Sequence, residues 1–74
     1  MTTKQRFRKY RIELRERDHA PAHVHLTGAG VDVLIHIDTL ESIGIWPAGV
    51  RTEVLAWVAA NRDELLKEWK KWHP

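Results

Sequence analysis

The sequence predicts an α+β fold, in which an antiparallel meander of three to four strands is covered on one face by one kinked helix or two C-terminal helices. In the first half of the chain apolar and polar residues alternate, and this period of two is typical of strands with one buried face. After Pro47 the apolar residues recur every three or four positions, as on one side of an amphipathic helix. Because each element has one hydrophobic side to bury, we expect the helices to cover the apolar sheet face and leave the other face open.

Alternation marks three strands and allows a fourth. The alternating segments are residues 10–15, 23–26 and 31–38. Gly28-Ala29-Gly30 is a turn signal between the second and third segments, and residues 42–46 can add a short strand before Pro47 ends it. We therefore place the sheet at about residues 6–46.

The second half of the chain predicts helix over about residues 48–72. The apolar stripe consists of Val50, Val54, Trp57, Val58, Leu65, Leu66, Trp69 and Trp72. Asn61 and Glu64 have the spacing of a capping box, so a break near Asn61 is expected, with one long helix as the alternative. The tryptophans of this stripe are expected to pack between helix and sheet, whereas Trp46, at the strand-to-helix corner, can lie in the core or on the open face. From the length of the chain we expect residues 1–74 to form a single domain.

Composition favours a small folded protein without covalent reinforcement. The 74 residues are 43% hydrophobic and 30% charged, and they include no cysteine, which excludes disulfides and thiolate metal sites. A domain of this size buries only about 60% of its unfolded surface, so we expect a thin core and a homodimer. The sequence contains neither a run of 18 apolar residues nor a signal-peptide h-region, so we expect a cytoplasmic protein with no membrane partner.

Positive charge is concentrated near the amino terminus, although the net charge is only +2. Seven of the twelve basic residues lie between Lys4 and Arg17, and only two glutamates offset them there. Such a segment can bind phosphates or an acidic protein, or it can simply protect an edge strand by charge. The residues that we expect to contact a partner are Arg11, Arg15, Arg17, His25 and Trp46.

The need to bury apolar side chains on one face predicts how the second and third strands pair. If Val24 and Leu26 lie on the same side as Val33 and Ile35, position 24 pairs with position 35 around a turn centred on Ala29-Gly30. His23 then lies opposite His36. The same register gathers further polar residues on the open face, namely His25, Asp32, Asp38, Arg11, Glu13, Arg15 and Arg17.

This histidine cluster is compatible with three kinds of chemistry. His19, His23, His25 and His36 can bind a divalent transition metal such as zinc, with an aspartate as a further ligand or acceptor. Alternatively, His23 or His36 can act as a general acid or base while Arg11, Arg15 or Arg17 stabilises a phosphate, as in a ribonuclease. In the third interpretation the histidines hydrogen-bond the backbone and line a surface that binds a partner. The residues leave open whether the protein is an enzyme.

Several motifs together resemble one known family. They are His19-Ala20-Pro21-Ala22-His23-Val24-His25 after Asp18, then Gly44-Ile45-Trp46-Pro47, and finally Trp57, Asn61, Leu65 and Trp69. This pattern is similar to the small bacterial domain of unknown function 4160 family, in which Asp-His-x-Pro-Pro-His-aromatic-His precedes a Gly-x-x-Pro step and a helical tail with tryptophans. The resemblance covers nearly the whole chain from Arg11. Ala22 replaces the second proline and Val24 replaces the aromatic residue, while the histidines are retained.

The resemblance implies a gene neighbourhood rather than a reaction. Members are often encoded beside another small open reading frame in predicted toxin-antitoxin pairs, and their activity is unassigned. We therefore expect a binding module that contacts a cognate partner protein, or RNA or DNA, through an open sheet face rich in arginine and histidine. The alternative is a toxin-like ribonuclease or metal-dependent hydrolase that uses the histidine cluster.

Overall fold

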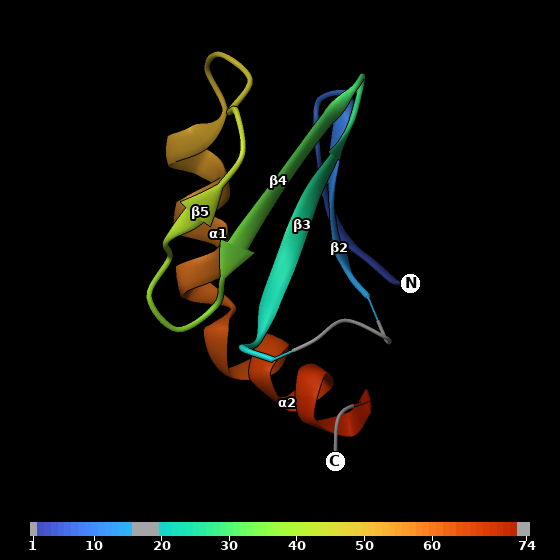
Figure 1. Ribbon diagram of the computed structural model, residues 1–74, viewed down its shortest axis with the longest axis vertical. Helices are drawn as coiled ribbons and strands as arrows, with labels where there is room; N and C mark the ends of the chain where they lie inside the picture. Colours follow the sequence, from blue (N-terminus) through green and yellow to red (C-terminus); the bar gives the residue numbers. More distant parts are fainter. Residues whose placement is uncertain (1, 16–19, 73–74) are drawn as a thin grey trace.

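The computed structural model describes residues 2–15 and 20–72, which form a five-stranded sheet and two helices (Figure 1). The elements are β1 (Thr2–Phe7), β2 (Tyr10–Leu14), β3 (His23–Gly28), β4 (Val31–His36), β5 (Ser42–Ile43), α1 (Arg51–Ala60) and α2 (Arg62–Trp72). All neighbouring strands are antiparallel, and their spatial order follows the chain from β1 to β5. The α+β meander is confirmed, with one strand more than predicted.

The additional strand is β1, which begins at Thr2 rather than near residue 6. It contains a single large apolar residue, Phe7, so no alternation marks it in the sequence. Its pairing with β2 runs from Thr2 opposite Leu14 to Phe7 opposite Tyr10, with an irregularity between Thr3 and Gln5. β1 lies at the margin of the sheet, where its described side chains are exposed or only half-buried, so few of them need to be apolar.

The register of β3 and β4 is the predicted one. Val24 pairs with Ile35 and His23 pairs with His36, around a two-residue turn at Ala29-Gly30. Both turn residues have positive φ, 48° and 79°, which suits the right-handed twist of a tight hairpin. The hairpin thus holds the two histidines on adjacent strands.

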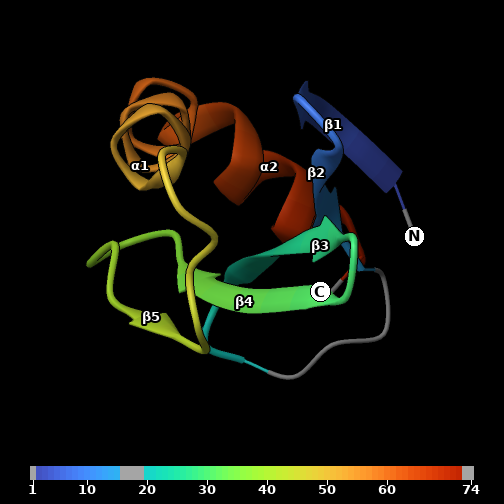
Figure 2. The same cartoon turned by 90° about the horizontal axis from the view of Figure 1, so that it is seen from above.

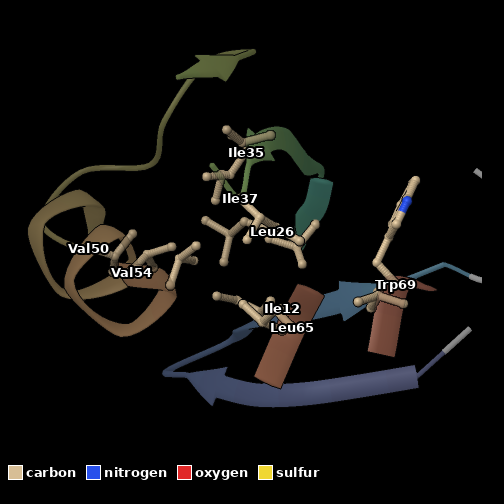
Figure 3. Packing of buried hydrophobic residues seen from close by; sticks show 12 residues of the cluster. Ile12, Leu26, Ile35, Ile37, Val50, Val54, Leu65 and Trp69 are labelled. Atoms are coloured by element: carbon tan, nitrogen blue, oxygen red, sulfur yellow. The ribbon is translucent and has the colours of Figure 1, made fainter. Parts of the chain in front are cut away.

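The helices lie on the concave side of the curved sheet and bury its apolar face (Figure 2). The core contains residues from β2, β3 and β4, from both helices, and from the segment between β4 and α1. These residues are Ile12, Leu14, Val24, Leu26, Val33, Ile35, Ile37, Val50, Val54, Val58, Leu65 and Trp69 (Figure 3). The predicted break is confirmed, because α1 ends at Ala60 and α2 begins at Arg62. The Asn61 side-chain amide donates to the Trp57 carbonyl at 2.8 Å and so caps the end of α1.

The tryptophans of the helical stripe differ in burial. Trp69 is buried in the core, and Trp57 is half-buried with its ring edge-on to Phe7 at 6.3 Å. The expectation that Trp72 packs between helix and sheet is wrong, because this residue is exposed at the last turn of α2. Its indole N–H donates to Glu68, which also accepts a hydrogen bond from Lys4 of β1 at 2.6 Å. Neither helix in the described part of the chain is long and apolar enough to cross a membrane.

Candidate functional site

The candidate site is the outer face of the sheet, by which we mean the face that the helices leave uncovered. Alternation along β2 places Arg11 and Glu13 on this face, Arg15 follows the strand and contacts Glu13, and Glu13 pairs with His25 of β3. His23, His25 and His36 share the face and lie opposite Val24 and its apolar neighbours, as predicted. Three predicted residues, Arg17, His19 and Asp18, lie outside the described residues.

A buried carboxylate links Arg11 of β2 to Arg15, the residue that follows the strand. Glu13 is only 1% exposed; it accepts a hydrogen bond from Arg11 Nε at 2.7 Å and lies 3.5 Å from Arg15 Nη2. Burial alone would raise the pKa of Glu13, but hydrogen bonds and charges from Arg11 and Arg15 outweigh it, so the pKa lies below the ordinary value of 4.5. Glu13 is therefore an anion at neutral pH, and it orients two guanidinium groups whose other sides remain accessible.

The expectation that His23 and His25 lie on an open surface is wrong, because both are buried. The His23 ring lies 5.1 Å from the rings of both His25 and Trp69, so α2 reaches round to this end of the face. His23 Nδ1 lies 2.8 Å from the Pro21 carbonyl oxygen, and His25 Nδ1 lies 3.1 Å from Asp32 Oδ1. The contact of His23 is with the backbone, as the third interpretation expects, whereas that of His25 is with a side chain.

His36 differs from the other two histidines in its surroundings. Its ring lies 6.3 Å from that of His23, and its buried Nδ1 has no hydrogen-bond partner among the described residues. It borders a hollow of about 190 Å³ whose remaining walls are Pro21, Ala22, Asp38, Thr39 and Glu41. Asp38 lies beyond the end of β4 and belongs to this hollow rather than to the middle of the face. The surroundings of His36 are thus acidic, whereas the surface around Arg11 and Arg15 is basic.

The described residues place no group of three or more histidine, aspartate and glutamate side chains where they could share a metal ion. His23 and His25 already engage one ring nitrogen each with neighbouring oxygens. A site that includes His19 depends on a residue outside the described part, so zinc binding by His19, His23, His25 and His36 stays a prediction.

Trp46 is half-buried and held in place at the strand-to-helix corner. Its indole N–H donates to Ser42 Oγ at 2.9 Å, and the Arg51 guanidinium lies 5.6 Å from its ring centre. It also packs against the core, so its ring is not a free surface for stacking. Besides Trp72, two large apolar residues of the described chain are exposed, namely Ile43 at 64% and Ile45 at 90%. The sequence alone did not single out these isoleucines, because their place at a sheet edge follows from the strand order of the folded sheet.

Together these features define a small α+β domain with a polar, internally bonded outer sheet face. The chain belongs to the family described as a domain of unknown function, DUF4160, which matches residues 10–70. No curated protein matches the chain, and no solved structure does. The family resemblance noted from the motifs is thereby confirmed.

Proposed function

We propose that this protein is a binding module whose β1–β2 hairpin and adjoining outer face hold an acidic partner protein. The observation that carries the proposal is the burial of Glu13 between Arg11 and Arg15. Burying a carboxylate is costly unless cations compensate it, and here the compensation also presents two guanidinium groups in defined positions on an uncovered face. Arginine side chains held in this way suit bidentate recognition of carboxylates.

The surrounding charges extend this basic surface. Arg6 pairs with Arg11 across the hairpin and is exposed, as are Arg8 and Lys9 in the turn. Residues 2–15 contain six basic residues and a single acidic one, the buried Glu13. A surface with this balance attracts acidic partners and accelerates their association.

A protein fits this surface better than single-stranded RNA does. Recognition of single strands uses exposed aromatic rings as stacking platforms, yet His23 and His25 are buried and Trp46 is engaged with Ser42 and Arg51. The resemblance to the family suggests where to look for the partner, which we expect to be the protein encoded by the adjacent gene. A ribonuclease reaction at His36 is less well supported, because Asp38 and Glu41 beside it would repel a phosphate.

The test must remove positive charge without leaving Glu13 buried and unpaired. We would replace Arg6, Arg11, Glu13 and Arg15 together by glutamine, which lowers the net charge by two and retains side chains that can hydrogen-bond. The matched control, Lys70→Gln with Lys71→Gln, removes the same net charge from exposed positions of α2.

Binding is measured by calorimetry with the neighbour-encoded protein and by fluorescence anisotropy with a labelled RNA oligonucleotide. We expect the quadruple variant to bind the protein at least about tenfold more weakly and the control to bind within about twofold of the wild type. Equal binding by the quadruple variant and the wild type would refute the proposal. Strong, salt-dependent binding to the RNA alone would assign the surface to nucleic acid instead.

A further inference from the structure

The two edges of the sheet differ in how they are protected. β1, the edge at one end of the curved sheet, carries Lys4 and Arg6 and an irregular pairing step, all of which discourage the addition of another strand (Figure 2). The opposite edge continues from β5 as Ser42-Ile43-Gly44-Ile45 and has no charged residue. β5 itself is only two residues long, but two exposed isoleucines without a neighbouring charge leave this edge open to pairing with another strand.

Local structure holds this edge segment against β4. Gly44 has a φ of 125°, and a Cβ atom there would lie 2.8 Å from the Asp32 carbonyl oxygen, so only glycine allows so close an approach. Ile45 then borders a hollow of about 430 Å³ together with Gly30, Val31 and Asp32. The Ile45 side chain and the hollow together can accommodate apolar side chains of another molecule.

Charge indicates what kind of molecule can occupy this edge. Asp32 lies at this hollow and Glu41 directly precedes Ser42, and a third exposed acidic residue, Asp38, belongs to the same β4–β5 connection and borders the hollow at His36. Two copies of this chain joined through their β5 edges would bring these carboxylates together, which disfavours a symmetric dimer. A segment that combines apolar residues with lysine or arginine would complement the same surface.

We infer that the β5 edge, Ser42–Ile45, is a docking site for an extended, basic and apolar segment of a partner protein, which adds a sixth strand to the sheet. In this mode of binding, main-chain hydrogen bonds supply affinity and alternate side chains supply specificity. Glu41 offers its carbonyl oxygen to the His36 N–H at 2.8 Å, so by alternation the backbone groups of Ser42 face away from β4 and toward the added strand. This site lies at the opposite end of the sheet from the basic hairpin, and it is independent of the function proposed above.

Ser42 provides a matched pair of variants. Ser42→Pro removes the outward N–H, which an edge strand tolerates, and also removes the hydroxyl that accepts the Trp46 hydrogen bond. Ser42→Ala removes only the hydroxyl. The comparison of the two variants therefore isolates the main-chain donor, and circular dichroism would check that both are folded.

The probe is a labelled synthetic peptide of about eight residues in which valine alternates with lysine or threonine. Anisotropy should show saturable binding to the wild type and to Ser42→Ala, and at least about tenfold weaker binding to Ser42→Pro. On the wild-type protein, N-methylation of alternate peptide nitrogens, or glutamate in place of lysine, should weaken binding similarly.

Three results would overturn the inference: no binding of the peptide by the wild type, equal binding by the two Ser42 variants, or undiminished binding of the N-methylated peptide. The quadruple glutamine variant of the basic hairpin should bind this peptide as the wild type does. That comparison separates a failure at the β5 edge from a failure of the function proposed for the hairpin.

Discussion

Replacing Arg11 by methionine is expected to destabilise the fold by about 2 kcal/mol at neutral pH. The hydrogen bond from Arg11 Nε to Glu13 is 2.7 Å long, and bonds to charged groups contribute about 1.5 to 3 kcal/mol. Two features keep the loss below that of a fully buried ion pair: the Arg11 side chain is 37% exposed, and Arg15 stays within 3.5 Å of Glu13. A domain of 74 residues has a total stability of about 4 to 11 kcal/mol, so this is a substantial fraction.

Urea denaturation followed by tryptophan fluorescence would measure the change, and thermal unfolding should show a fall in Tm of about 8 to 16 °C. The control is the same substitution in a Glu13→Gln background, where no buried charge is left unpaired and the cost should fall to about 1 kcal/mol. If Arg11→Met costs the same in both backgrounds, or less than about 0.5 kcal/mol in the wild type, the role given to the Arg11–Glu13 pair is wrong.

The pH dependence of this difference has a definite sign. In the wild type the pKa of Glu13 is lowered, so the stability it contributes is present above the ordinary value of 4.5 and is lost as pH falls through the pKa of the folded state. When Arg11 is replaced, less positive charge opposes the effect of burial, so we expect the pKa of Glu13 to rise. The gap in stability between wild type and Arg11→Met should therefore narrow between pH 7 and pH 3, and a gap that widens would contradict this reasoning.

Two further substitutions test the scaffold. Gly28→Ala should cost at least about 2 kcal/mol in urea denaturation, because Gly28 has a φ of 122° and an added Cβ would lie 2.5 Å from the Lys9 carbonyl oxygen; a neutral result would show that the β2–β3 contact can shift easily. Leu26→Ala removes a fully buried side chain from the middle of the core and should cost about 3 kcal/mol by the same measurement, whereas a loss under about 1 kcal/mol would mean that the core around it can collapse.

The strands and helices differ in how readily the sequence predicts them. The β3–β4 hairpin is predictable because its parity and its turn are both encoded within residues 23–36. The helix break is predictable from the spacing of Asn61 and Glu64. By contrast, β1 depends on pairing with β2 rather than on its own apolar pattern, since Phe7 is its one large apolar residue. A strand of this kind cannot be recognised before its neighbour is known.

The candidate site was only partly predictable. Period-two alternation predicts that His23, His25 and His36 lie on one face of the sheet, and the register of β3 and β4 confirms this prediction. The exposure of these histidines to solvent could not be predicted in the same way, because it depends on which residues pack beside them. Trp69 lies far from His23 along the chain, but the centres of their rings are 5.1 Å apart in space.

By itself, the sequence determined the side of the sheet on which each residue of β2, β3 and β4 lies, because parity follows from local alternation once the apolar face is assigned to the core. Only the tertiary structure decided which residues of the outer face reach solvent. Burial of a side chain depends on contacts between elements that are distant in sequence, such as α2 with the start of β3. For the same reason, the contrast between the charged β1 edge and the apolar β5 edge became visible only when both ends of the sheet were in place.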